Sequence, residues 1–473
     1  YSAIENVEEK EFYELSPAQK RLYIQQQENP GSIAYNLPGF YIVSDDFDKE
    51  KFEAAFRELI KRHESLRTSF EMIEMNPVQR IYKNVEFEIE YFDIALDNAG
   101  EHEVTDRPAH LIRHFSRSFM RPFGLSRPPL FRVGLLEIEE KRLLLMVDMH
   151  HIIADGFSIQ LLIGEFKALY KGFSLSELKV RYKDYSRWQN LRMTSGEIKR
   201  QEEYWLKEFG GEIPELRLPL DYKRGEQRSF KGSGLSFSLD GETEAKLRTL
   251  AKEEEVTQFI FLSAIYYIFL FKLSGQEDIV MGTVTAGRGH ADLEKIIGMF
   301  VNTLALRNFP RPDRCFDEFL AEVKKRTLDA FENQDYQFED LVEKLRPDCD
   351  AGRNPLFDVV FTFISQGTSP GAGELERGEK GLKISECKSE ENNTMFDLVF
   401  GVFDWGGKIG FVMQYNTQLF KESTIERFAG YFKEIVRSVL ANKNIRLGEI
   451  AVSHDLQAAQ ANVYKETQMD FEF

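Results

Sequence analysis

The feature that most constrains the fold is a pair of short apolar stretches separated by a few charged residues. Residues 131–138 and 142–149 are the two stretches, and Glu-Glu-Lys lies between them. Apolar stretches of this length on either side of a tight polar turn predict neighbouring β-strands. The chain then passes through His150 and His151 and enters residues 159–170, where apolar positions recur at helical spacing. We therefore predict two strands, a loop that carries two histidines, and a helix.

The length of the chain predicts more than one folded unit, because 473 residues exceed what one hydrophobic core usually serves. We expect an N-terminal lobe over residues 1–175 that carries the histidines, a connection over 176–228, a second α/β lobe over 229–452 and a linker over 453–473. Residues 366–381, rich in Gly, Ser and Glu, are typical of a flexible loop. Apolar periodicity also predicts helices over 49–62, 242–254, 259–273 and 316–331, and strands over 66–70, 279–283 and 301–307.

Composition and charge exclude several classes of function. The formal net charge of −17, from 61 basic and 78 acidic residues, disfavours binding to nucleic acid or to an anionic membrane. The longest apolar run, residues 259–271, is shorter than the about 20 residues of a membrane span, and we expect a buried helix there. Cys315, Cys349 and Cys387 form no disulfide or zinc pattern, which fits the cytoplasm. The first residues lack an initiator Met and a signal peptide, as expected for a segment of a longer polypeptide.

The residues from His150 to Gly156 have the chemistry expected of a reaction centre. A histidine at a strand end is held by the sheet, and the N–H groups of the following helix stabilise a developing negative charge. Asp155 stands where the N-cap of that helix would lie, so it can cap the helix or pair with an arginine from another segment. Gly156 leaves room for a long substrate arm. On these residues alone a structural role is the more common outcome for the histidines, and chemistry is the alternative.

A zinc site is a weaker interpretation of the same histidines. The other six histidines of the chain form no ligand-spaced set with His150 and His151, so no metal is expected. Successive residues of a strand point to opposite faces of the sheet. We therefore expect one of the two histidines to face inward and the other outward.

Seven motifs, in order along the chain, resemble those of the condensation domains of nonribosomal peptide synthetases. The segment HHIIADGFS at residues 150–158 resembles the His-His-x-x-x-Asp-Gly signature of that family. The others are LSPAQKRLY at 15–23, RHESLRTSF at 62–70, YKDYSRW at 182–188, IGMFVNT at 297–303, NQDYQFE at 333–339 and RNPLFD at 353–358. Together they cover nearly the whole chain, so a chance match is negligible.

This resemblance implies an α/β fold of two chloramphenicol acetyltransferase-like lobes in a V-shaped pseudo-dimer, with the histidine motif in a central tunnel. It implies that an upstream donor carrier protein and a downstream acceptor carrier protein deliver thioesters on phosphopantetheine arms, and that an adenylation domain adjoins. The domain itself would bind no cofactor. His151 would face the reacting atoms, while His150, Asp155 and Gly156 would shape the loop.

The task of His151 follows from the acidity of the acceptor. An α-amine has a pKa of about 8, so removing its proton near neutral pH costs under about 1 kcal/mol and base catalysis before attack gains little. The amine becomes strongly acidic once it bonds to carbon. We therefore expect His151 to position the amine and to accept its proton as the tetrahedral intermediate forms.

Asp155 is expected to form a buried ion pair that holds the loop. Arg288 is the favoured partner and Arg67 the second choice. The alternative for either arginine is a solvated surface charge.

The sequence also departs from the family pattern. It has Phe157, Asn333 and Gln337 where Trp, His and Pro are common, so substrate selectivity does not transfer from relatives. Arg21 in the opening motif favours the subtype that takes an L-configured donor.

Other members of the superfamily remain as alternatives. A stand-alone acyltransferase shares the histidine motif but needs no polar tail, and an epimerisation domain shares it but does not accept two carriers. A cyclisation domain replaces the histidines by acidic residues and is excluded. A non-catalytic recruitment module of the same fold usually loses the second histidine, which is present here as His151.

Overall fold

The structure, a computed structural model, divides into two compact units that are not contiguous in sequence. It describes residues 3–44, 47–92, 114–115, 118–139, 142–345, 352–365, 383–386 and 392–452. Unit 1 comprises Tyr1–Ile198, Ala286–Val301 and Gly367–Glu390, and unit 2 comprises Lys199–Thr285, Asn302–Gln366 and Glu391–Phe473.

The boundaries of these units differ from the expected ones. Two segments of the expected second lobe belong to unit 1, because Ala286–Val301 folds against the histidine motif and Lys383–Glu386 pairs with a strand near the N-terminus. The expected connection is divided as well, since the helix Gly196–Glu208 contains the boundary between the units. The expected flexible loop (366–381) and the C-terminal linker lie outside the described residues.

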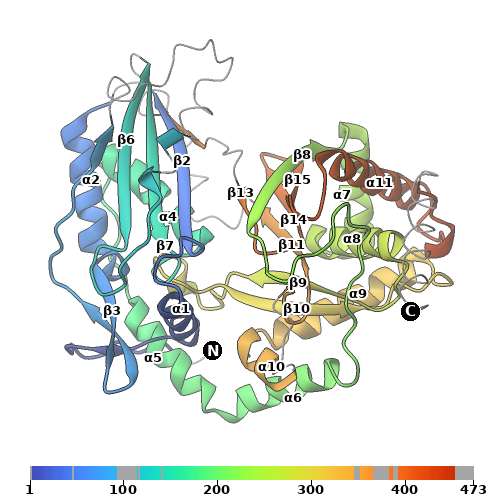
Figure 1. Cartoon of the computed structure of the whole chain (residues 1–473), viewed down its shortest axis with the longest axis horizontal. Coiled ribbons are helices and arrows are strands. Elements are labelled where there is room, and N and C mark those ends of the chain that lie inside the picture. Colours follow the sequence, from blue (N-terminus) through green and yellow to red (C-terminus); the bar gives the residue numbers. More distant parts are fainter. Residues whose placement is uncertain are drawn as a thin grey trace. The chain divides into compact units, whose positions relative to one another are not determined.

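Unit 1 is built on a five-stranded sheet in the order β12-β2-β7-β6-β5 (Figure 1). Its strands are β12 (Lys383–Glu386), β2 (Asn36–Ser44), β7 (Arg142–His150), β6 (Phe131–Glu139) and β5 (Glu90–Phe92). The predicted strand pair is confirmed as β6 and β7, which run antiparallel. A smaller sheet contains β1 (Tyr13–Glu14), β4 (Asn76–Ile81) and β3 (Thr68–Ile73), and a 3₁₀ turn, Glu64–Arg67, replaces the start of the strand expected over 66–70.

The helices α2 (Lys49–Arg62) and α4 (Gly156–Tyr170), both predicted from periodicity, pack together in the main core of unit 1. The ring of Phe166 lies 4.9 Å from that of Phe52 and 4.8 Å from that of Phe56. Two further helices, α1 (Pro17–Glu28) and α5 (Tyr182–Met193), carry the first and fourth motifs. They place side chains of those motifs beside the histidine loop.

Alternation along β7 gives the sheet of unit 1 two buried faces. Leu145, Val147 and Met149 belong to the main core, and Leu144 and Met146 belong to a smaller cluster on the opposite face. Residues 148 and 150 continue this second face by the same alternation. They are Asp148 and His150, and both side chains are fully buried.

Unit 2 contains a seven-stranded sheet in the order β10-β9-β11-β14-β15-β8-β13, with α7, α8 and α11 on one side of it (Figure 1). Its strands are β8 (Lys231–Ser238), β9 (Ile279–Thr285), β10 (Asn302–Asn308), β11 (Val359–Ser365), β13 (Asn392–Asn393), β14 (Leu398–Trp405) and β15 (Lys408–Asn416). Its helices are α6 (Gly196–Glu208), which enters unit 2 at Lys199, and α7 (Gly241–Glu253), α8 (Gln258–Ser274), α9 (Phe316–Glu332), α10 (Phe338–Leu345) and α11 (Glu422–Ala441).

The elements predicted for the second half are present as α7, α8, α9, β9 and β10, within a few residues at each end. The long apolar helix is α8, and most of its side chains are buried in unit 2, as expected. Within the described part of the chain, no single helix is both long and apolar enough to cross a membrane; only α7 and α8 counted together, across a bend of 109°, pass on length and composition.

Candidate active site

The histidine loop connects the end of β7 to the start of α4. His150 is the last residue of β7, and His151 begins the turn that follows it. Asp155 is the N-cap of α4, as predicted: its Oδ1 accepts a hydrogen bond from the Ser158 N–H at 2.7 Å. At Gly156, a Cβ would meet no atom within 4 Å, so the start of α4 borders open space. The predicted strand–loop–helix unit is therefore present.

His150 is enclosed in unit 1 and held in one tautomer. Its Nδ1 accepts a hydrogen bond from the Ile152 N–H at 3.1 Å, which leaves the proton on Nε2, 3.4 Å from Gln26 Oε1. The ring of Phe123 meets it edge-on, with 6.1 Å between centroids. Burial, with a smaller contribution from His151, lowers the pKa of His150 to about 3. At neutral pH His150 is an uncharged group that shapes the turn.

His151 lies beyond the end of the strand and is partly exposed. One histidine was expected to face inward and the other outward, and His150 is indeed buried while His151 is partly exposed. The reason differs from the expected one: His151 lies in the turn after β7, so the two side chains are not separated by the alternation of a strand. The His151 N–H donates to the carbonyl of Tyr35 at 2.8 Å, which anchors its backbone to the start of β2. Burial lowers the pKa of the His151 imidazole, and the charge of Asp155 acts in the opposite direction. The ring is therefore neutral at physiological pH and able to accept a proton.

The predicted ion pair between Asp155 and Arg288 is present. Arg288 Nη2 lies 3.2 Å from Asp155 Oδ1, and the two side chains are 3% and 0% exposed. The same guanidinium donates to Ser158 Oγ at 2.9 Å and lies 4.0 Å from the centroid of the Phe300 ring. Its Nη1 donates to two backbone carbonyls, those of Leu293 and Ile296. Arg288 thereby joins the histidine loop to the segment Ala286–Val301.

Arg67, the second choice of partner, has other contacts. It lies 3.9 Å from Glu64 Oε1 and donates to the carbonyl of Tyr82 at 2.5 Å. The carboxylate of Asp155 is already satisfied by Arg288, by the Ser158 N–H and by the Phe300 N–H at 3.1 Å. The alternative pairing with Arg67 is therefore wrong.

Other motif residues hold the backbone around the loop. Gln19, from the opening motif, donates to the carbonyl of Ile152 at 3.2 Å. The Tyr182 hydroxyl donates to the carbonyl of Met299 at 2.5 Å and lies 2.9 Å from the Ser16 hydroxyl. These contacts join four segments of unit 1.

The three departures from the family pattern are all accommodated. Phe157 lies against the guanidinium of Arg288, 4.5 Å from its ring centroid. In unit 2, Asn333 ends α9 and donates to the carbonyl of Asp329 at 2.8 Å, and Gln337 donates to the carbonyl of Asp335 at 3.0 Å.

Two buried ionic groups of unit 1 were not predicted from the sequence. In the first, Glu165 on α4 accepts from Arg62 at 3.1 Å and lies 2.6 Å from His63 Nε2. In the second, Asp148 lies 3.2 Å from Nη1 of Arg132. The only sequence feature that could have indicated the first group is that Arg62 and His63 lie in one of the seven motifs. For the second group, the only such feature is that Asp148 is a charged residue at the end of an otherwise apolar strand.

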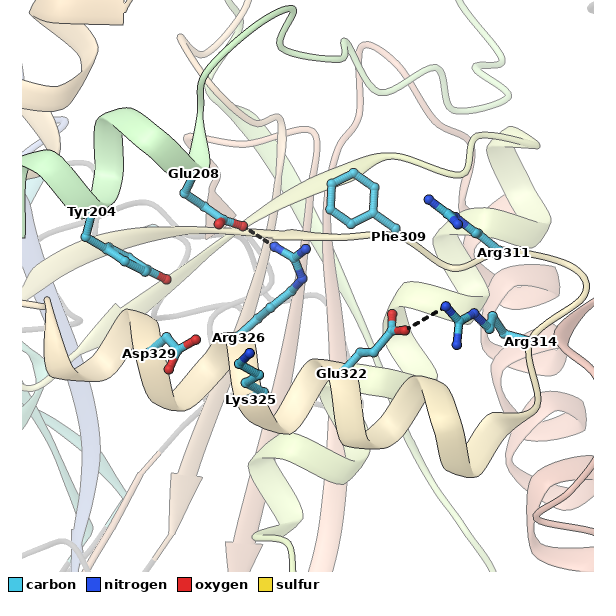
Figure 2. Close-up of a pocket in the computed structure, with 9 residues that line it drawn as sticks. All are labelled: Tyr204, Glu208, Phe309, Arg311, Arg314, Glu322, Lys325, Arg326 and Asp329. Atoms are coloured by element: carbon cyan, nitrogen blue, oxygen red, sulfur yellow. Dashed lines mark hydrogen bonds and ion pairs between the residues drawn. The ribbon is translucent and has the colours of Figure 1, made fainter.

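A separate pocket of about 400 Å³ lies within unit 2, between α6, α9 and the segment after β10 (Figure 2). Its lining carries charges of both signs, and Arg326 pairs with Glu208 and Arg314 with Glu322. No predicted site residue lines it. Across the described residues, no group of three or more His, Cys, Asp and Glu side chains is arranged to hold a metal ion.

Comparisons with known proteins agree on the family. The family model for the Condensation domain matches residues 9–461. Bacitracin synthase 3 of Bacillus licheniformis is 42% identical over 455 residues, which are 96% of this chain and 7% of that synthase. The chain thus spans less than a tenth of the length of this curated relative.

Solved structures share the fold. A four-domain nonribosomal peptide synthetase bound to AMP and glycine matches with a TM-score of 0.81 and 22% identity, over 95% of this chain and 34% of that one. The X-domain from teicoplanin biosynthesis, solved in complex with OxyB, matches with a TM-score of 0.80 and 22% identity, over 96% of this chain and 98% of that one. The α/β fold expected from the motifs is confirmed, and the chain belongs to the condensation-domain family.

Proposed function

We propose that this domain forms peptide bonds in a modular nonribosomal peptide synthetase. The observation that carries the proposal is the intact histidine loop. A neutral and partly exposed His151 stands at the end of β7, and a buried Asp155–Arg288 pair fixes the loop behind it. A non-catalytic site has no need of a histidine that is kept unprotonated and accessible.

The proposed reaction transfers an acyl group from sulfur to nitrogen. The lone pair of the acceptor α-amine attacks the thioester carbon of the donor, and a C–N bond forms as the carbonyl π electrons move to oxygen. When the intermediate collapses, the C–S bond breaks and the donor arm leaves as a thiolate. His151 takes the proton that the attacking nitrogen loses and passes it to that sulfur, so the ring is neutral again at the end.

The geometry of His151 supports this role. Its Nδ1 is buried, so Nε2 is the nitrogen that a reacting amine can reach. Because the backbone of His151 is anchored to Tyr35, the ring projects from a fixed point. We assign to His151 the positioning of the amine and the acceptance of its proton, and to His150, Asp155 and Gly156 the shaping of the loop.

The partners of this reaction follow from the proposal. The donor and the acceptor arrive on phosphopantetheine arms of an upstream and a downstream carrier protein, and the domain itself holds no cofactor. An adenylation domain adjoins it in the cytoplasmic assembly. We also propose an L-configured donor, on the strength of Arg21 in the opening motif.

The test is a reconstitution with two carriers. The chain is incubated with a donor carrier and an acceptor carrier, each loaded with an aminoacyl thioester, and mass spectrometry follows the acyl chain on the acceptor. We expect a dipeptidyl acceptor, and a rate at least about 100-fold lower for His151→Ala. His114→Ala, at an exposed histidine of unit 1, is the matched control and should retain the rate. A His151→Ala protein that folds and forms peptide at the normal rate would overturn the assignment.

A recruitment module is the second candidate, because the X-domain solved with OxyB has the same fold. The reconstitution separates the two functions. A recruitment module would leave both loaded carriers unchanged, whereas an epimerisation domain would invert a loaded residue without lengthening the chain.

A further inference from the structure

Behind His150 lies a buried ionic network that the proposed reaction does not use. Its centre is Asp148, two residues before His150 on the same face of β7 and fully buried. Arg132 stands directly opposite Asp148 in the β6–β7 register, and Asn36 stands opposite His150 in the β2–β7 register. Asp148 Oδ2 receives hydrogen bonds from Arg132 at 3.2 Å and from Asn36 at 2.8 Å. All three central strands of the sheet thus contribute to the network.

The network holds the segment that leads into β6. Arg132 Nη1 donates to the carbonyls of Phe119 at 3.1 Å and Arg121 at 2.7 Å, and Asn36 donates to the Arg121 carbonyl as well, at 3.1 Å. The Arg121 guanidinium in turn binds Glu90 of β5. Residues 119–123 are therefore held to three strands by polar contacts.

This segment carries the ring that encloses His150. The guanidinium of Arg132 lies 3.7 Å from the centroid of the Phe123 ring, and the edge of that ring meets His150. His150 then accepts the Ile152 N–H and so fixes the turn that contains His151. A continuous chain of contacts leads from the carboxylate of Asp148 to the backbone of the reactive residue.

We propose that Asp148 and Arg132 are positioning residues for the reaction: they clamp Phe123 onto His150 and thereby hold the turn from which His151 projects. The inference rests on the proposed function. A buried ion pair seldom stabilises a protein more than apolar side chains of the same size do. An apolar side chain at position 132 would fill the space but would take one donor away from each of the carbonyls of Phe119 and Arg121, so the pair is suited to orienting the segment that carries Phe123.

The charge state of Asp148 governs this clamp. The charged groups that face it are Arg132 from β6, Arg121 from the segment before β6 and Glu90 from β5, while Asn36 faces it from β2. Burial raises the pKa of Asp148 to about 7, against the attraction of Arg132. Its Oδ1 has no partner among the described residues, which adds to the cost of the charged form. As the pH falls through about 7, Asp148 takes up a proton and Arg132 loses its counter-charge.

The pH dependence of peptide formation tests the proposal. The acceptor amine, with a pKa of about 8, makes the rate fall about tenfold per pH unit on the acid side. A second group that must be ionised adds another factor of about ten, so the logarithm of the wild-type rate should fall with a slope of about 2 below pH 7. Asp148→Asn, which cannot ionise, should be at least about tenfold slower at pH 8 and should fall with a slope of about 1.

Two further variants guard against a purely structural explanation. Arg132→Lys keeps the charge but lacks the planar fork of donors, so it should be slower at pH 8 and retain the slope of 2. Glu165→Gln removes another buried carboxylate of unit 1, the one bound by Arg62 and His63, and should lower the melting temperature without changing the slope. An Asp148→Asn protein with the wild-type rate and slope would overturn the proposal.

An experiment without turnover separates this inference from the proposed function. In the folded wild type, ¹⁵N-labelled His150 should show a neutral ring with the proton on Nε2, and in Asp148→Asn its two nitrogen resonances should move toward an averaged position. If the wild type forms no peptide, the proposed function fails, but the ¹⁵N resonances of His150 still test whether Asp148 and Arg132 hold that ring in place. If the resonances of His150 are unchanged in Asp148→Asn, the clamp fails whatever the activity.

Discussion

At the scale of single residues, Asp155 combines two tasks that usually fall to different side chains. It caps α4 and it neutralises Arg288, and both of its oxygens are occupied. Removal of one partner from a buried ion pair leaves an uncompensated charge, which typically costs about 3–5 kcal/mol. Loss of an N-cap costs about 1 kcal/mol. The ion pair is therefore the larger contribution.

We predict that Asp155→Ala lowers the free energy of unfolding by about 3–5 kcal/mol and reduces soluble yield. Asp155→Asn keeps an N-cap side chain but loses the charge, so it should recover only about 1 kcal/mol of this loss. Urea unfolding of the three proteins gives the comparison. Asp48, which caps α2 at a solvent-accessible site, is the matched control, and Asp48→Ala should cost clearly less, because only a cap is lost. Equal losses for Asp155→Ala and Asp48→Ala would show that the ion pair contributes nothing.

At the scale of elements, the segment Ala286–Val301 leaves the sheet of unit 2 after β9 and folds into unit 1 before β10 begins. Gly287 allows the backbone to take this path. Its φ is 63°, and a Cβ on this residue would lie 1.9 Å from the carbonyl oxygen of Phe300. The neighbouring Arg288 depends on this backbone for its aim at Asp155. A change of rotamer cannot relieve this clash, because the atom that a Cβ would meet belongs to the backbone.

We predict that Gly287→Ala destabilises unit 1 by about 3 kcal/mol or more and slows peptide formation, since the backbone must move and Arg288 with it. Thermal unfolding and the reconstituted reaction measure the two effects. Gly430, inside α11 and with open space around it, is the control. Gly430→Ala should raise stability by about 0.5–1 kcal/mol without affecting the rate. Wild-type behaviour of Gly287→Ala would contradict the argument.

The elements also show how far sequence alone leads. The strands β6 and β7 and the helices α2, α4 and α8 were predictable because their apolar periodicity is local. The pair Asp155–Arg288 joins residues 133 positions apart and was reached only through the family motifs. The contacts of Asp148 with Arg132 and Asn36 follow from the registers of two strand pairs, which no local pattern specifies. The boundaries of the units were missed for the same reason, since β12 joins β2 across more than 300 residues.

At the scale of the whole molecule, the histidines are distributed unevenly. The residue ranges of unit 2 contain one of the eight histidines, His454, which lies outside the described residues. Among the described residues of unit 1, burial lowers the pKa of three histidines, namely His63, His150 and His151. It also contains Asp148, whose pKa burial raises to about 7. The response of the two units to acid should therefore differ.

The sign of that response follows from proton uptake. A histidine with a lowered pKa in the folded state stabilises the protein fully above about pH 6.5, and this stability is lost as the pH falls, because the unfolded chain binds the proton first. Between pH 6.5 and 5.5 His150, whose folded pKa is about 3, costs about 1 kcal/mol, and His63 and His151 add losses of the same sign. Asp148 acts in the opposite sense, since its folded form takes up a proton earlier than its unfolded form, and it returns about 1 kcal/mol over the same range.

We predict a net loss in the stability of unit 1 between pH 6.5 and 5.5, and a much smaller change in unit 2. Proteolysis pulses across a urea gradient, with peptides mapped by mass spectrometry, report each unit separately. His63→Gln, which keeps a hydrogen-bonding group beside Glu165 but cannot take a charge, should reduce the loss in unit 1. If both units instead lost the same stability, the loss would come from carboxylates, which both units contain. The buried histidines would then not be its cause.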